Sequence, residues 1–201
     1  MNSKAIIVLI ISMCALLIQC RKENADSKQE SCVTEEQITS DYDKFYIYYP
    51  GLQENGYARA IKINKEWNAS AIAGIYNNKL QVSLTTYLVE NNNDLNYKAE
   101  LFIFEINNAK TKCYFVGSEN ILDTVKVLCL AVNGDAIQNA YVPNQEIKNQ
   151  FQIDAFDIVN KRVSGKFNLT MKKDRLYQGG PWYNPDELRF FNGEFHCNIV
   201  D

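Results

Sequence analysis

Apolar and polar residues alternate along most of the chain from residue 45 onward. A period of two is typical of strands that bury one face and expose the other. The alternation is clearest in the segments 45–49, 61–63, 80–84, 151–155, 163–172 and 194–199, while 101–106 and 125–132 are almost continuously apolar. These segments predict a chain built from many short strands.

Turn signals rich in asparagine separate the predicted strands. They include Asn77-Asn78, Asn107-Asn108, Asn133-Gly134-Asp135, Asn160-Lys161 and Asn192-Gly193. Strands punctuated this regularly predict an all-β fold, either an antiparallel β-sandwich or a barrel-like sandwich. Helical periodicity is scarce, and the capping-box pattern of Thr34 and Gln37 predicts at most one short helix.

The alternation also assigns residues to the two faces of the last strands. Those predicted to be buried together are Phe167, Leu169, Phe195 and Ile199, and those predicted to face water are Lys166, Asn168 and Glu194.

The N-terminus has a different pattern. Residues 5–18 form an apolar run of 14 residues after Lys4, and the run ends on Gln19-Cys20 with a polar stretch behind it. A signal-peptide core needs roughly 7–15 apolar residues, whereas a membrane-crossing helix needs about 20. We therefore expect a signal peptide over residues 1–19. An uncleaved short anchor is the alternative.

The flank around Cys20 resembles the lipobox of bacterial lipoproteins, with Gln19 in place of the usual Gly or Ala. The resemblance implies that Cys20 carries a diacylglycerol thioether and an acylated amine, and several acyl chains hold a protein stably on a membrane. Residues 20–31 contain no large apolar side chain after Cys20 and are predicted to form a flexible tether. Residues 32–201 are then expected to form a single β domain in the cell envelope, at the outer membrane, with the leaflet left open.

Three segments of this domain carry a family resemblance. They are Glu66 to Ala71 (EWNASA), Phe151 to Phe167 (FQIDAFDIVNKRVSGKF) and Phe191 to Phe195 (FNGEF). Together they resemble an uncharacterised family of small Bacteroidota lipoproteins, over roughly residues 58–200. The resemblance implies a β-sandwich in the cell envelope and supplies no catalytic residues.

Charge and motifs narrow the classes of function. Loss of Lys4 with the signal peptide changes the formal net charge from −3 to −4, and no basic cluster remains. Nucleic-acid binding is therefore not expected. The cysteine spacing fits no zinc site, and no motif for a nucleotide, a metal or another cofactor occurs.

Four of the six cysteines remain once Cys14 leaves with the signal peptide and Cys20 takes lipid. An exported domain permits disulfides, and four cysteines allow three connectivities. Cys113 and Cys129 flank an apparent hairpin centred near Ile121, which makes a Cys113–Cys129 bond a candidate. Because both lie in apolar segments, two free buried thiols are an equally open alternative.

Few residues are candidates for catalysis. His196, the only histidine in the chain, alternates with Phe195 and Cys197, so we expect it on the surface without a nucleophile beside it. Asp154 and Asp157 could serve a hydrolase that uses carboxylates alone. The plainer interpretation places Asp154 on a polar strand face and makes Asp157 a turn former.

One stretch, Leu176 to Phe191 (LYQGGPWYNPDELRFF), is irregular and aromatic, and it predicts a long loop between two strands. Tyr177, Trp182 and Tyr183 are the candidate binding residues, because loops on rigid β scaffolds often carry function. The alternative is that Trp182 folds back as a lid on the core.

These patterns favour a non-enzymatic envelope lipoprotein that binds a glycan or a protein partner through loops. A hydrolase using carboxylates alone and a purely structural envelope component are the alternatives. Convergence of two or more Asp or Glu side chains in a concave pocket would indicate the enzyme, and a concavity lined by aromatics and amides would indicate the binder.

Overall fold

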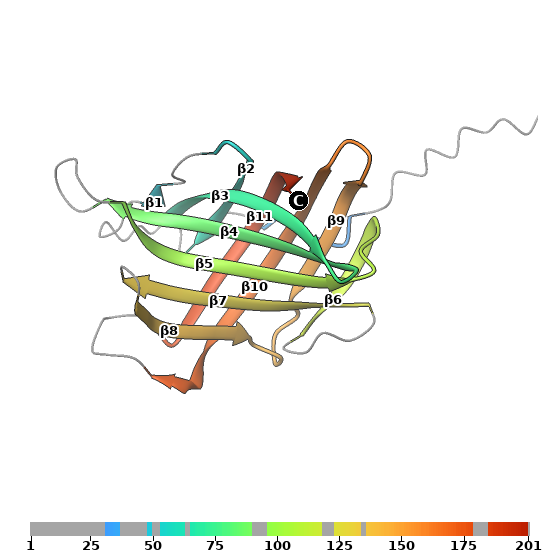
Figure 1. Cartoon of the computed structure of the whole chain (residues 1–201). Helices are drawn as coiled ribbons and strands as arrows, with labels where there is room; N and C mark the ends of the chain where they lie inside the picture. The colour runs from blue at the N-terminus through green and yellow to red at the C-terminus, as the bar shows by residue number, and fades with distance from the viewer. Residues whose placement is uncertain are drawn as a thin grey trace, which may run out of the picture. The chain divides into compact units, whose positions relative to one another are not determined.

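The computed structural model describes residues 31–36, 48–49, 53–62, 65–89, 96–117, 123–133, 136–178 and 185–200 (Figure 1). They belong to a compact unit, Ser31–Asp201, and contain strands without any helix. Within these ranges, accordingly, no helix has the length and apolarity to cross a membrane. The strands are β1 (Tyr48–Tyr49), β2 (Gly56–Lys62), β3 (Lys65–Tyr76), β4 (Lys79–Val89), β5 (Asn96–Asn107), β6 (Lys112–Gly117), β7 (Thr124–Asn133), β8 (Ala136–Pro143), β9 (Gln150–Asp157), β10 (Arg162–Gln178) and β11 (Glu187–Val200).

The sheet closes on itself. Hydrogen bonds lead from β2 through β3, β4, β5, β7, β6, β9, β10 and β11 back to β2. The long strand β10 pairs with β9 along its first half and with β8 along its second half, and β8 in turn pairs with β7. The prediction of an all-β, barrel-like fold is confirmed. Nearly all pairings are antiparallel, with short parallel contacts between β6 and β7 and between β11 and β3.

Aromatic side chains fill the interior of the closed sheet. Phe104 lies 5.1 Å from Phe151 and 5.7 Å from Phe167 between ring centroids, and Phe151 lies 5.8 Å from Phe195. All four rings are fully buried. Burial of each such side chain is worth about 1.5–3 kcal/mol. The predicted group of Phe167, Leu169, Phe195 and Ile199 is confirmed as part of this core.

The turn predicted at Asn192-Gly193 is wrong. Both residues lie inside β11, where the register shifts between Phe191 and Glu194 against β2. Asn192 has a φ of 51°, a left-handed conformation that asparagine tolerates better than most residues. The pair therefore forms a bulge rather than a chain reversal, since Asn-Gly suits both and the strand continues on each side. The predicted Asn77-Asn78 turn, with φ of 50° and 62°, does join β3 to β4.

The predicted short helix after Thr34 lies mostly outside the described residues, and residues 34–36 themselves are not helical, with polar side chains of the sheet bound to their backbone. A further sequence prediction needs correction. The long loop predicted over Leu176 to Phe191 is shorter than expected, since β10 continues to Gln178 and β11 begins at Glu187. Pairing between β10 and β11 ends at Lys172 and Glu187, and the end of β10 at Gln178 pairs with Asn139 of β8 instead.

Gly165 provides a test of the packing. A Cβ on Gly165 would collide with the Gln152 carbonyl oxygen and stand 2.7 Å from the Phe195 ring. We expect Gly165→Ala to lower the free energy of unfolding by about 1–3 kcal/mol, as overpacked cores do. Gly74→Ala is the matched control, because its Cβ would meet only the Tyr76 ring, which is 56% exposed and free to move. Equal losses for the two variants in urea denaturation would contradict this account of the core.

Candidate functional site

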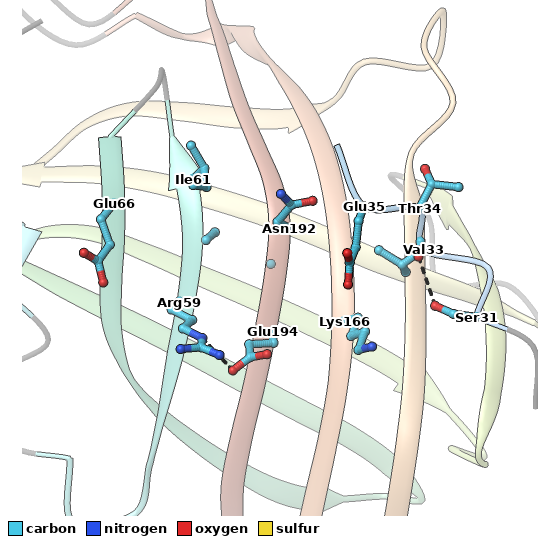
Figure 2. A pocket seen from close by; sticks show the side chains of 12 residues that line it. Ser31, Val33, Thr34, Glu35, Arg59, Ile61, Glu66, Lys166, Asn192 and Glu194 are labelled. Carbon is cyan, nitrogen blue, oxygen red and sulfur yellow. Dashed lines mark hydrogen bonds and ion pairs between the residues drawn. The ribbon is translucent and has the colours of Figure 1, made fainter. Parts of the chain in front are cut away.

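A groove of about 900 Å³ lies on the outer face of the sheet over β2, β3, β10 and β11 (Figure 2). Eight of its twelve lining residues are polar or charged, because outward residues of these strands alternate with the buried core residues. The lining residues are Ser31, Val33, Thr34, Glu35, Arg59, Ala60, Ile61, Glu66, Lys166, Asn192, Gly193 and Glu194.

Charges of both signs alternate across the floor of the groove. Register places Arg59 of β2 opposite Glu194 of β11, and Glu194 opposite Lys166 of β10. Arg59 Nε donates to Glu194 Oε1 at 2.7 Å, and the Arg59 side chain remains 62% exposed. An exposed pair of this kind adds about 0–1 kcal/mol to stability. Its main effect is to present a guanidinium and a carboxylate side by side on the floor.

One wall of the groove is the strap, which we define as residues 31–36. The strap crosses the outer face of β9, β10 and β11, and amide side chains of those strands hold its backbone. Gln152 Oε1 accepts the Cys32 N–H at 2.9 Å, and Asn168 Nδ2 donates to the Thr34 carbonyl at 2.7 Å. Asn192 makes a two-point contact with Glu36, accepting its N–H at 2.8 Å and donating to its carbonyl at 2.9 Å.

These amides behave like the edge of a neighbouring strand. A primary amide carries a donor and an acceptor side by side, so it can match the N–H and C=O of an extended backbone. Asn168 was predicted to face water, and that prediction is wrong, since Asn168 is 6% exposed beneath the strap. Its burial is acceptable because its oxygen also accepts the Asn192 N–H at 2.8 Å, which satisfies both ends of the amide.

A disulfide ties the strap to the sheet. Cys32 bonds Cys113 of β6, with 6.2 Å between their Cα atoms and a sequence separation of 81. The predicted Cys113–Cys129 bond is therefore wrong. The error came from the assumed hairpin, because β6 runs parallel to β7 and pairs with β9 on its other side.

Cys129 and Cys197 are free thiols within the core. Burial raises the pKa of Cys197 to about 12 and raises that of Cys129 well above its usual range. Both thiols therefore stay protonated at physiological pH, and neither is suited to act as a nucleophile.

A second polar cluster lies inside the sheet. Lys62 and Glu100, each about 5% exposed, form a buried ion pair, and Trp67 Nε1 donates to Glu100 Oε2 at 2.9 Å. Thr86 lies opposite Glu100 on the neighbouring strand, and Asn139 lies two strands from Glu100 in the same row of the sheet. Thr86 Oγ1 and Asn139 Nδ2 are both buried without a hydrogen-bond partner. Each such atom costs about 1–3 kcal/mol. All of these side chains face the packed interior, so the outer groove is the better candidate for binding.

The sequence-predicted catalytic candidates do not meet at the groove. His196 is exposed and lies 5.1 Å from the Tyr57 ring, as expected for a surface histidine. Asp154 is exposed and accepts a hydrogen bond from Gln152 at 2.7 Å. Asp157 accepts the Asn160 N–H at 2.9 Å, and this turn lowers the pKa of Asp157, which confirms it as a turn former.

Several predicted residues fall outside the described ranges. Cys20 does so, and so do Trp182 and Tyr183 of the candidate binding loop. Tyr177 lies on β10, and its side chain is not described. Their roles stay predictions. Among the described residues no group of three or more His, Cys, Asp or Glu side chains is placed to hold a metal ion.

Sequence reasoning missed the groove. Arg59, Glu66, Lys166 and Glu194 come from four strands, and only register brings them to one surface. The groove contains three carboxylates, two cations and one amide, but no aromatic side chain, so it lacks the aromatic lining expected of the predicted binder, and its carboxylates come from β3, β11 and the strap.

Comparison with known proteins identified no relative of this chain. No family model matches the chain, and no curated protein or solved structure matches it.

The cysteine assignment can be tested by peptide mapping without reduction. We expect one disulfide-linked product that contains Cys32 and Cys113. A thiol-alkylating reagent at mildly alkaline pH should leave Cys129 and Cys197 unmodified in the folded protein and label both after denaturation, because burial keeps them protonated and covered. Rapid labelling of either thiol in the folded protein would contradict their placement.

The role of Asn192 in holding the strap can be tested by hydrogen exchange. Asn192→Gly keeps the left-handed backbone but removes both contacts with Glu36. With about 1 kcal/mol per hydrogen bond, exchange in residues 33–36 should accelerate by tenfold or more. Asn78→Gly, at another left-handed asparagine, is the control and should leave this exchange unchanged.

Proposed function

We propose that this chain is a lipid-anchored, non-enzymatic binding protein of the cell envelope. It holds an extended polypeptide segment of a protein partner in the groove on its outer face. The apolar run of residues 5–18 and the lipobox-like flank of Cys20 support the location. We propose the groove on the sheet as the binding site, rather than the 176–191 loop, because the described residues form a concave surface there.

The strap is the observation that carries the proposal. This face of the sheet already binds one polypeptide segment through its backbone, with Gln152, Asn168 and Asn192 as the contacts. The groove lies directly beside the strap and offers further donors and acceptors of both charges. A surface of this kind suits an extended segment of a partner lying alongside the strap, since backbone contacts supply affinity and side chains supply specificity.

A polypeptide fits the groove better than a glycan does. Sugar rings favour the flat faces of aromatic side chains, and none of the twelve lining residues is aromatic. The Arg59–Glu194 ion pair and the neighbouring Lys166 ammonium instead suit a polypeptide with polar and charged side chains.

The positions of the carboxylates argue against hydrolysis. Figure 2 shows Glu66 and Glu35 on opposite sides of the groove, with β2 and β11 between them. Three strand spacings, roughly 14 Å, separate β3 from β10, and Figure 2 shows neither side chain pointing toward the other, as a catalytic pair with carboxyl groups about 5–9.5 Å apart requires. The third, Glu194, is held by Arg59.

The proposal can be tested with a displayed library of random peptides selected on the mature protein. Peptides so obtained should bind at least tenfold more weakly to Lys166→Glu, which reverses a charge on the groove floor. Lys172→Glu, an exposed position on the same strand outside the groove, is the control and should bind like the wild type.

Two results would overturn the polypeptide assignment. The first is a peptide set that binds both variants equally, since the groove would then not be the site. The second is a glycan-array signal that Lys166→Glu abolishes while no peptide is selected, since the groove would then take a sugar.

A further inference from the structure

The disulfide determines where the chain preceding the strap leaves the domain. Cys32 is bonded to Cys113 of β6, and its N–H is bound by Gln152 of β9. Ser31 therefore departs at the junction of β6 and β9, whatever course the earlier residues take.

The number of residues between Cys20 and Ser31 limits the distance between the junction of β6 and β9 and a lipid on Cys20. Eleven residues lead from Cys20 to Ser31. Fully extended they reach at most about 36–40 Å. A domain of this size is roughly 40 Å across, so a lipid anchor holds the β6 side nearest to the membrane.

Phe115 is exposed at this place. It is 78% exposed and follows Cys113 by two residues on β6, so both lie on the outer face while Tyr114 between them is buried. Lys110 is exposed just before the strand, and the Tyr114 hydroxyl holds its backbone through two hydrogen bonds of 2.7 and 2.8 Å. An exposed aromatic ring on a strand that follows an exposed lysine in the chain suits the boundary between lipid headgroups and acyl chains.

We infer that the outer face of β6 around Phe115 rests on the membrane surface, with the Phe115 ring inserted at the headgroup boundary. This inference rests on the lipid anchor of the proposed function. Other exposed apolar residues are less well placed. Val159, 92% exposed, lies in the turn that follows β9, six residues beyond Ile153, the β9 partner of Lys112.

The experiment uses the mature lipidated protein in vesicles of phosphatidylethanolamine and phosphatidylglycerol. Phe115→Trp and Val159→Trp each add an indole, and wild-type emission is subtracted. Lipids brominated near the headgroup should quench the added emission of Phe115→Trp by at least half and leave that of Val159→Trp nearly unchanged.

Flotation of the vesicles separates the two possible failures. Wild-type protein should float with the vesicles, and Cys20→Ala should not. Cys20-dependent flotation with an unquenched Trp at position 115, or with equal quenching at both positions, would overturn the docking face alone. Flotation that does not depend on Cys20 would overturn the lipid anchor, and the docking face with it.

Discussion

Closure of the sheet is the constraint on which the rest of this structure depends. A ring of strands has a single interior, so every inward side chain must fit the others, and Phe104, Phe151 and Phe195 meet there in one stack. Replacing or adding a few atoms at Gly165 therefore affects the whole ring. Side chains on the outer face do not have to pack against one another in this way. The strap, the charged floor and the groove all lie on that face.

Alternation predicted the strands and the buried residues because a period of two identifies the face of each residue. It could not predict the groove, since the approach of Arg59, Glu194 and Lys166 depends on register, which alternation leaves open. The cysteine pairing failed for the same reason. Cys113 was placed opposite Cys129 on an assumed hairpin, whereas β6 inserts between β7 and β9 and brings Cys113 to the strap.

Polar residues were the other source of error. Asn168 is predicted to face water, yet Asn168 and Gln152 are only 6% and 3% exposed. An amide is buried readily when hydrogen bonds satisfy both of its ends, and for each of these two the strap provides one of the partners from more than one hundred residues away in the chain. Sequence reasoning found the core, but the site depends on contacts between distant segments.

The bond between Cys32 and Cys113 also has a mechanical consequence. A pull on the chain ahead of Ser31 meets a covalent bond before it meets any hydrogen bond beyond Cys32. The load then passes into β6, which is paired on both sides with β7 and β9. Val33, Thr34 and Glu35 lie behind that bond and bear no tension, so the wall of the groove keeps its shape while the tether is under force.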